Sequence, residues 1–285
     1  SVIVSAPTGA GKTAIAEHVI KGSLEKKIGV IYTAPIKALS NQKFRDFQGQ
    51  FQDNIGILTG DVSLNPLAPV LIMTTEILRN KILDEPDSLK KYSWVIFDEI
   101  HYIDNPERGT VWEESLIFLP KHMNILGLSA TIPNIKEFAS WIESIHDKPI
   151  KTVIENKRPV PLHFFFPIGD KIVDKIDALK RLRFMKPKKI SFLINHIRSQ
   201  EGLPCIYFVF GRRRAEELAE ELASISFLNK DERAKITDLY LSLCERFQLK
   251  SDRTAQNLYQ LIQQGIAYHH AGMLPTLKEV IERLF

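Results

Sequence analysis

The first thirteen residues, SVIVSAPTGAGKT (Ser1–Thr13), run from an apolar stretch into a loop of small residues and then into the helical pattern AIAEHVI. Gly9 and Gly11 let the backbone N–H groups of the loop turn inward, and the positive end of the following helix adds to the attraction for an anion. The segment fits the P-loop template except at its first position, where Ala6 replaces glycine. A strand, a glycine-containing loop and a helix in this order predict a site for nucleotide phosphates.

Six short apolar runs, separated by helical patterns, predict the strands of one parallel sheet in the first half of the chain. The predicted strands are 2–6, 29–34, 54–60, 70–75, 94–99 and 124–131, and the predicted helices are 13–23, 36–50, 75–83, 109–119 and 135–146. Near-continuous apolar strands are covered on both faces, so we expect the doubly wound α/β class, with ligands at the carboxyl ends of the strands. Asn134 and Glu137 also predict a capping box at the last of these helices.

The segment ENKRPVPLH (155–163) interrupts this rhythm with two prolines and charged residues, and we interpret it as a linker. The domains are then residues 1–154 and 164–285. After the linker, strands are expected at 163–167, 204–210 and 265–270, and helices at 211–222, within 229–264 and at 274–285. We therefore expect two α/β lobes, the second of them interrupted.

Composition limits the classes of protein that the chain can belong to. Its 285 residues, 44% hydrophobic and 25% charged, suit a globular protein of two domains, and no apolar run approaches the about 20 residues that span a bilayer. Cys205 and Cys244 are too far apart for a CxxC motif, which favours a reduced, intracellular compartment. The net charge is −3 over residues 1–150 and +7 over 151–285, with a basic run at 178–200. That balance permits a polyanionic partner, although the run taken alone favours a solvated helix face.

The segment WVIFDEIH (94–101) places two acids at the end of a buried strand, downstream of the P-loop. Buried carboxylates are unfavourable unless they meet a cation, so Asp98 is predicted to hold Mg²⁺ and Glu99 to orient and deprotonate an attacking water. Lys12 is predicted to reach the β- and γ-phosphates, and the Thr13 hydroxyl to bind Mg²⁺. Acids also begin ordinary turns after strands, and the P-loop upstream favours the catalytic interpretation here.

Asp98-Glu99-Ile100-His101 resembles the DExH box of superfamily 2 helicases, and GLSATIPN (127–134) resembles their Ser-Ala-Thr motif. Longer segments are similar to the superkiller-type DExH RNA helicases, namely TAPIKALSNQKFRDF (33–47), LTGD (58–61), MTTEILRN (73–80), ERGTVWEE (107–114) and YHHAGMLP (268–275). They follow the order of the family nearly from end to end. The Ala-Pro-Thr-Gly form of the P-loop resembles that of the bacterial members.

This resemblance implies two RecA-like lobes, the second incomplete, in an ATP-dependent RNA helicase that uses ATP and Mg²⁺. It implies ATP binding by Ala6, Pro7, Thr8, Gly9, Ala10, Gly11, Lys12 and Thr13, with Lys12, Asp98 and Glu99 catalytic, Thr13 and Asp98 on Mg²⁺, and His101, Ser129 and Thr131 coupling hydrolysis to movement. It implies nucleic-acid contacts at Pro35, Lys37, Gly60, Asp61, Thr74, Thr75, Phe210, Gly211, Arg212, His270 and Gly272. The expected partners are single-stranded RNA and proteins of RNA degradation or processing.

The residues also favour a site that follows a nucleic-acid backbone. Pro35–Lys37, Gly60–Asp61 and Thr74–Thr75 each lie where a strand ends, and N–H groups, hydroxyls and a lysine there suit contacts with phosphate and sugar. For Thr75, the residues alone favour simple N-capping of the next helix. His269 and His270 are adjacent on a predicted strand and should point to opposite faces, so we reject a shared metal ion.

In this family an arginine motif follows in the second lobe and a region before the P-loop contacts adenine, and neither is found in the chain. We therefore expect part of a larger, intracellular helicase with a monomeric core and no membrane partner, cytoplasmic if bacterial. Alone, the chain should bind nucleotide poorly to moderately and hydrolyse it weakly or not at all. A DNA helicase or double-strand translocase, a nucleotide switch that does not unwind, and a scaffold are the alternatives.

Overall fold

A computed structural model of the chain describes residues 1–168, 171–174 and 189–285. The chain divides into two compact units, Ser1–Leu162 and His163–Phe285, and the division falls within the segment interpreted as a linker. Residues 178–188 of the basic run lie outside the described residues. Within the described part of the chain, no helix is long and apolar enough to cross a membrane.

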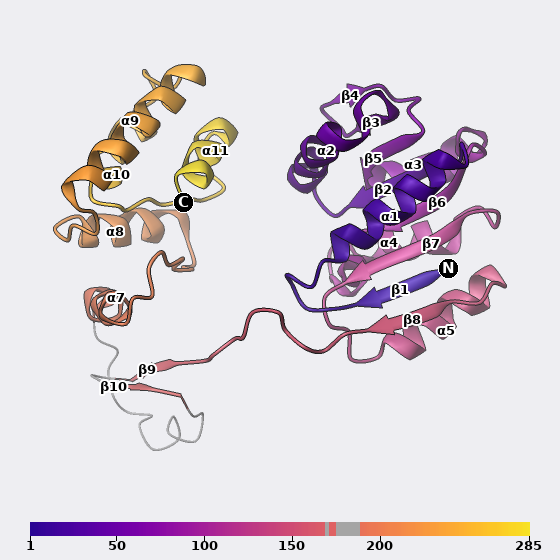
Figure 1. Cartoon of the computed structure of the whole chain (residues 1–285), viewed down its shortest axis with the longest axis horizontal. Helices are drawn as coiled ribbons and strands as arrows, with labels where there is room; N and C mark the ends of the chain where they lie inside the picture. Colours follow the sequence, from indigo (N-terminus) through magenta and orange to yellow (C-terminus); the bar gives the residue numbers. More distant parts are fainter. Residues whose placement is uncertain (169–170, 175–188) are drawn as a thin grey trace. The chain divides into compact units, whose positions relative to one another are not determined.

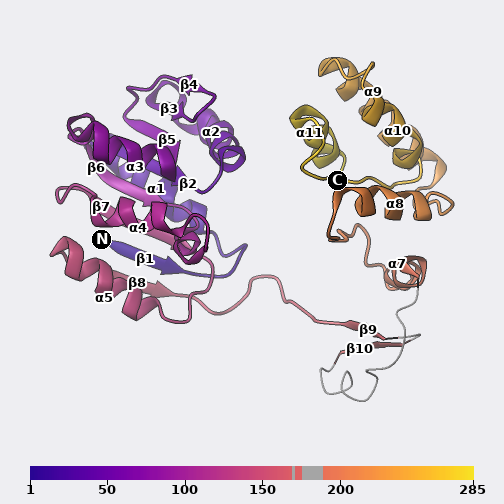
Figure 2. The same ribbon diagram turned by 180° about the vertical axis from the view of Figure 1, so that it is seen from behind.

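Unit 1 contains an eight-stranded sheet with helices on both faces (Figures 1 and 2). Its strands are β1 (Val2–Ser5), β2 (Gly29–Ala34), β3 (Ile55–Leu58), β4 (Ser63–Leu64), β5 (Val70–Thr74), β6 (Tyr92–Phe97), β7 (Asn124–Ser129) and β8 (Lys151–Ile154). Its helices are α1 (Lys12–Glu25), α2 (Lys37–Phe51), α3 (Thr75–Asp84), α4 (Gly109–Ile117) and α5 (Ile135–His146), with 3₁₀ turns η1 (Gln52–Asn54), η2 (Pro86–Leu89) and η3 (Ile100–Asp104). The six strands and five helices predicted for this half are confirmed.

The strand order is β4-β3-β5-β2-β6-β7-β1-β8, and every neighbouring pair is parallel except β3 with β4. In the middle of the sheet, Ile31 of β2 lies opposite Leu71 of β5 and Val95 of β6. The predicted doubly wound α/β class is therefore confirmed for unit 1. The edge strand β8, beside β1, was not predicted.

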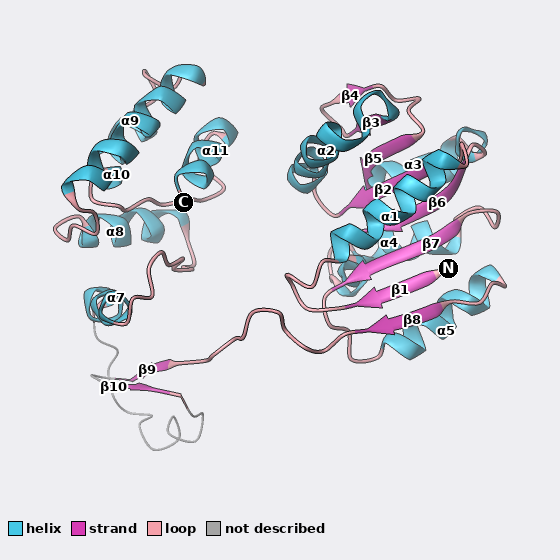
Figure 3. Ribbon diagram, in the orientation of Figure 1, coloured by secondary structure: helices cyan, strands magenta, loops and turns pink. Residues whose placement is uncertain are grey.

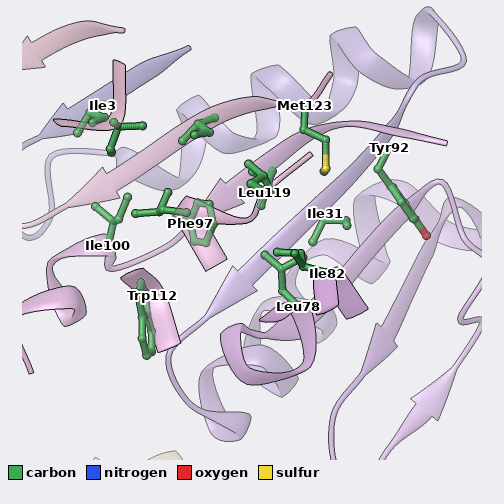
Figure 4. Close-up of a cluster of buried hydrophobic side chains, with 14 of the residues drawn as sticks. Ile3, Ile31, Leu78, Ile82, Tyr92, Phe97, Ile100, Trp112, Leu119 and Met123 are labelled. Carbon is green, nitrogen blue, oxygen red and sulfur yellow. The ribbon is translucent and has the colours of Figure 1, made fainter. Parts of the chain in front are cut away.

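Alternate residues of the strands enter two separate cores. Ile31 points into the core that includes Leu78 of α3 and Trp112 of α4 (Figure 4). Its neighbour Tyr32 points the other way, into the core that includes Ile20 of α1 and residues of α2. Each such large apolar side chain contributes about 1.5–3 kcal/mol when it is fully buried. Burial on both faces explains why the central strands are continuously apolar.

Unit 2 is built mainly from helices (Figure 3). They are α7 (Ile190–Ser199), α8 (Arg212–Leu222), α9 (Lys230–Arg246), α10 (Arg253–Ile262) and α11 (Pro275–Leu284), and an antiparallel pair is formed by β9 (Phe166–Ile168) and β10 (Lys171–Val173). The side chains of Leu258, Leu277 and Val280 are fully buried in its core. Helix α7 lies within the basic run 178–200, for which a helix face was the favoured interpretation, and α8 and α11 match the predicted segments closely.

A second parallel sheet was expected, and the described residues of unit 2 do not form one. Residues 204–210 and 265–270 have no strand pairing, and the side chains of Phe208 and Phe210 are 89% and 102% exposed. An apolar run becomes a strand only where neighbouring strands accept its backbone hydrogen bonds, and these runs lack such neighbours here.

The predicted capping box at α5 is also wrong. Asn134 is the N-cap residue, but its φ and ψ of −104° and 33° are not the extended values that capping needs, and its side chain makes no capping hydrogen bond. A complete capping box lies at α9 instead. There the side chain of Asn229 accepts from the N–H of Glu232, and the Glu232 side chain accepts from the N–H of Asn229.

Candidate nucleotide and nucleic-acid site

The predicted site segments of unit 1 follow the carboxyl ends of parallel strands, so they lie along one edge of the sheet. The nucleotide candidates follow β1 and end β7, and the nucleic-acid candidates follow β3, β5 and β2. The acids Asp98 and Glu99 follow β6, which lies between β2 and β7. The acid pair is therefore next to both groups.

The loop between β1 and α1 has a conformation suited to phosphate binding. Gly9 and Gly11 have φ angles of 86° and 82°, in the left-handed region that glycine adopts without strain. Gly11 is the N-cap of α1 and has no side chain to occupy the first N–H groups of the helix. Lys12 Nζ donates to the carbonyl oxygens of Ala6, at 2.8 Å, and Pro7, at 3.2 Å. The loop itself is formed by Ala6, Pro7, Thr8, Gly9, Ala10 and Gly11.

Asp98 is held in place by three hydrogen bonds. The hydroxyl of the buried Tyr32 donates to Asp98 Oδ2 at 2.6 Å, and the N–H of Glu99 donates to Oδ1 at 3.1 Å. The backbone N–H of Asp98 itself donates to the carbonyl of Thr33. Burial first, and the Asp98 carboxylate second, raise the pKa of the Tyr32 hydroxyl well above its ordinary value, so it remains a donor.

Glu99 joins the acid pair to the Ser-Ala-Thr segment through His101. Its backbone lies in the left-handed region, with φ and ψ of 52° and 46°, which costs a non-glycine residue about 1–2 kcal/mol. His101 Nδ1 lies 3.3 Å from Glu99 Oε2 and 3.4 Å from the hydroxyl of the buried Ser129. Glu99, which follows β6, and Ser129, which ends β7, are thus both in contact with His101 of η3.

Ser5 ties the Ser-Ala-Thr segment to the strand that precedes the P-loop. Its hydroxyl donates to the carbonyl of Ala130 at 3.3 Å and accepts from the N–H of Ile132 at 3.0 Å. Thr131, between these two contacts, is exposed. A displacement of Thr131 is therefore linked to β1 and to the loop that follows it.

The residues predicted to bind Mg²⁺ have donor atoms that suit it. Mg²⁺ prefers oxygen ligands, keeps several waters and is usually held by one or two protein groups together with phosphate oxygens. Thr13 offers a hydroxyl and Asp98 a carboxylate, and the described residues contain no group of three or more His, Cys, Asp or Glu that could hold a metal alone. Lys43 Nζ of α2 donates to Thr13 Oγ1 at 3.1 Å, which places a second lysine beside the P-loop.

Lys37, Gly60 and Asp61 are brought together at the ends of β2 and β3. Lys37 Nζ lies 2.7 Å from Asp61 Oδ2, and the side chains are 53% and 71% exposed. A Cβ added to Gly60 would lie 3.1 Å from the same Nζ, so the lysine passes closely over the glycine. The carbonyl of Pro35, at the start of this turn, accepts a hydrogen bond from Arg108. An exposed ion pair of this kind stabilises by about 0.2–1 kcal/mol, which leaves Lys37 easily available to a phosphate.

Thr74 and Thr75 are buried at the end of β5. Thr74 is the N-cap residue of α3 and Thr75 is its first residue, so the expectation that Thr75 caps the helix is wrong. The Thr75 hydroxyl is buried without a hydrogen-bond partner among the described residues. Contact of either threonine with nucleic acid remains a prediction.

The predicted residues of unit 2 gather at the start of α8. Gly211, with a φ of 93°, is the N-cap of α8, and Arg212 follows it, with its Cδ 3.2 Å from the position of a Cβ on Gly272. His270 accepts from the N–H of Gly272 and its Nε2 lies 2.9 Å from a carboxylate oxygen of Glu216. His269 lies 3.2 Å from a different carboxylate, that of Glu282. Phe210 is fully exposed.

Comparison with known proteins identifies the first unit. Residues 1–138 match the model of the DEAD/DEAH box helicase family. The match extends from β1 into α5, so it includes every candidate segment of unit 1. These residues form a DEAD/DEAH box helicase domain.

The remainder of the chain resembles helicases as well. "ATP-dependent RNA helicase mtr4" of Schizosaccharomyces pombe is 38% identical over 326 residues, covering 100% of this chain and 29% of that protein. "Exosome RNA helicase MTR4" of Homo sapiens is 37% identical over 317 residues, covering 100% and 30%. "Superkiller complex protein 2" of Mus musculus is 39% identical over 327 residues, covering 100% and 26%. The resemblance to superkiller-type DExH helicases is confirmed, and the chain spans less than a third of the length of these relatives.

Four residues of the helicase domain were not singled out from the sequence. Tyr32 lies opposite Ile96, two residues before Asp98 on the same face, so its role depends on a strand register that the sequence does not state. Lys43 lies on the helix after β2, inside the segment that carries the family resemblance. Arg108 lies in the segment ERGTVWEE, which was noted only for that resemblance. Ser5 ends β1 and showed no sequence signal.

Proposed function

We propose that this chain is the ATP-hydrolysing and strand-binding part of an ATP-dependent RNA helicase. The observation that carries the proposal is the direct contact of Glu99 with His101 and of His101 with Ser129. It links the predicted hydrolytic base to the segment predicted to move. Two of the relatives described above bear the name RNA helicase, which favours RNA over DNA as the strand.

In the proposed mechanism, the residues of the helicase domain divide the work at the nucleotide. ATP with Mg²⁺ supplies the transferable phosphoryl group and neutralises part of its charge. The N–H groups around Gly9 and Gly11 cradle phosphate oxygens, and Lys12 turns from the loop carbonyls to the anion. Tyr32 and the Glu99 N–H fix the Asp98 carboxylate, which would hold Mg²⁺. The hydroxyl of Thr13 would hold the same ion.

Glu99 is the proposed base that orients the attacking water and accepts its proton. With its backbone in the left-handed region, Glu99 contacts His101. A change in the position or protonation of Glu99 would reach Ser129 through His101. Because Ser5 binds the same segment from β1, a change at Ser129 also reaches the P-loop strand. These contacts are the means by which hydrolysis would be coupled to movement.

We further propose that the strand is held by its sugar-phosphate backbone. Exposed Lys37 over Gly60, together with Arg212 in unit 2, would contact phosphates without reading bases, so binding should be salt-sensitive and blind to sequence. An RNA-degrading assembly is the proposed partner, because one relative is named for the exosome. Because that relative is named as an exosome helicase, we also propose that this protein lies inside the cell.

The proposal is tested with the full-length protein under three conditions. ATP turnover is measured alone, with single-stranded RNA and with single-stranded DNA of the same sequence, and RNA should stimulate it most. Stimulation by DNA alone would indicate a DNA helicase, and the absence of stimulation by either polymer would indicate a nucleotide switch.

The proposed base is tested separately. Glu99→Gln should bind ATP as tightly as the wild type but lose turnover, whereas Glu113→Gln, on the exposed face of α4, should keep it. Turnover that survives in Glu99→Gln would refute the assignment of the base.

A further inference from the structure

Arg108 makes contacts with three different elements of the helicase domain. Its Nη2 donates to the carbonyl oxygen of Pro35 at 2.5 Å, and its Nε donates to Glu76 Oε1 at 3.1 Å. Its Nη2 also forms an ion pair with Glu76. Its guanidinium carbon lies 5.7 Å from the centre of the buried Trp112 ring. One side chain thus connects the start of α4 with the turn after β2 and the first turn of α3.

The backbone around Arg108 is held rigidly to the segment that follows the acid pair. Asn105 Oδ1 accepts from the N–H groups of Glu107 and Arg108, both at 3.0 Å. The N–H of Gly109 donates to the Asn105 carbonyl, and a Cβ on Gly109 would lie only 2.2 Å from the carbonyl oxygen of Ile103. Any side chain at this position would force the corner between η3 and α4 to shift.

Packing continues this connection back to the acid pair. The Trp112 ring stacks on Tyr102 of η3, with centroids 5.6 Å apart and planes 26° apart. Ile100, the residue after Glu99, is fully buried in the same core as Trp112 (Figure 4). Buried groups cannot be displaced independently because the core is close-packed. A shift of Glu99 and Ile100 is thus passed to Trp112 and to the arginine above it.

The partners of Arg108 lie beside the candidates for strand binding. Pro35 begins the turn that carries Lys37, and Glu76 follows Thr75 in the first turn of α3. Pro35 follows β2 and Glu76 follows β5, whereas Arg108 comes after β6 and η3 in the chain. Arg108 therefore bridges the nucleotide half and the nucleic-acid half of one sheet edge.

We propose that Arg108 is a positioning residue that couples the state of the nucleotide site to the affinity for the nucleic-acid strand. This inference rests on the proposed function and goes beyond it, because Arg108 is not among the residues predicted to bind the nucleotide or the nucleic acid. The planar guanidinium can donate to Glu76 and to the Pro35 carbonyl at once, whereas a lysine ammonium on a flexible stem does not reproduce this fork. Arg108→Lys keeps the charge and should lose the coupling.

The measurement is a coupling factor in the full-length protein. It is the RNA dissociation constant without nucleotide divided by that with a non-hydrolysable ATP analogue, and such factors are typically about 5–150. Arg108→Lys should reduce this coupling factor about fivefold or more, toward a value of one. Its affinity for the analogue without RNA should change less than about twofold, which also shows that the site is folded.

A matched control is a second ion pair nearby, between α3 and α4. Arg79 Nη1 of α3 lies 3.6 Å from Glu114 Oε2 of α4, with exposures similar to those of Arg108 and Glu76, and this pair does not reach the Pro35 carbonyl. Arg79→Lys should keep the wild-type coupling factor. If Arg108 and Glu76 act as one unit, Arg108→Lys with Glu76→Ala should lose no more coupling than the worse single variant.

The outcomes separate this inference from the proposed function. A wild-type protein whose RNA affinity is the same with and without the nucleotide analogue refutes the inference, whereas the proposed function fails if RNA does not stimulate ATP turnover. A wild-type protein with coupling that Arg108→Lys leaves intact, or reduces no more than Arg79→Lys does, refutes the inference alone. A variant that binds RNA more weakly to the same extent with and without nucleotide would make Arg108 a simple structural or strand-binding residue.

Discussion

Removing one oxygen atom from Tyr32 should weaken the Mg²⁺ site without disturbing the fold around it. Tyr32→Phe deletes the hydroxyl that donates to Asp98 Oδ2 at 2.6 Å and leaves the fully buried ring in place, so no cavity of consequence is formed. A hydrogen bond to a charged group contributes about 1.5–3 kcal/mol. We therefore expect the free energy of unfolding to fall by about that amount, and Asp98 to lose its fixed orientation.

The effect on the metal follows from that orientation. Groups that orient a metal ligand typically change metal affinity by about 10–100-fold when they are removed. The assay is a Mg²⁺ titration of ATP turnover and of nucleotide binding in the full-length protein, and Tyr32→Phe should need about 10-fold or more Mg²⁺ for half-saturation. The matched control is Tyr92→Phe, because the buried Tyr92 hydroxyl donates to the carbonyl of Ala68 at 3.1 Å, away from the site. That control should cost about 0.5–1.5 kcal/mol of stability and leave the Mg²⁺ requirement unchanged. Equal Mg²⁺ requirements in the two variants would refute the reasoning.

Three other predictions follow from single contacts. Gly109→Ala should destabilise the folded protein by about 1–3 kcal/mol, because its Cβ would lie 2.2 Å from a backbone oxygen. The control Gly22→Ala, in open space on α1, should stabilise it by about 0.5–1 kcal/mol. Chemical denaturation compares the two variants. Burial lowers the pKa of His146 below its ordinary value of 6.5, so the unfolded chain binds a proton that the folded chain does not. The stability of the folded state should therefore fall as the pH drops below about 6.5. His146→Gln should flatten this pH dependence in thermal unfolding, and an unchanged profile would contradict the prediction. Lys37→Gln should weaken RNA binding by the full-length protein equally for all sequences and reduce the salt slope by about 1, whereas a sequence-dependent loss would argue for base contacts.

The elements that the sequence predicted well are those specified by local pattern. The run GVIYTA (Gly29–Ala34) is buried at every position, so its continuous apolarity indicated a central strand. The strand β8, KTVI (Lys151–Ile154), has only four residues and is exposed along most of its length, so it lacks the longer apolar run that indicates a central strand. The run at 204–210 is as apolar as a central strand but has no strand beside it, because pairing depends on residues distant in sequence. Local pattern therefore identified the sheet of unit 1 and the helices α8 and α11 of unit 2, but it wrongly assigned strands to the runs 204–210 and 265–270.

In the candidate site, too, the sequence indicated the residues set by local pattern and missed those set by long-range contacts. The glycines of the P-loop and the pair Asp98-Glu99 are adjacent in the chain to the strands that place them, so spacing alone indicated their roles. Tyr32 and Arg108 act on residues 66 and 32 or more positions away, through strand register and helix packing. A pattern of residue types contains no record of such contacts, which is why both were found only in the folded structure.

Displacement of a paired strand tests the central proposal most directly. The substrate is an RNA duplex with a single-stranded tail, and the full-length protein is supplied with ATP or with a non-hydrolysable analogue, as wild type and as Glu99→Gln. We expect displacement only by the wild type with ATP. Displacement that continues with the analogue or in Glu99→Gln would show that hydrolysis at this site does not drive unwinding. A wild-type protein that hydrolyses ATP but never displaces the strand would contradict the assignment as a helicase.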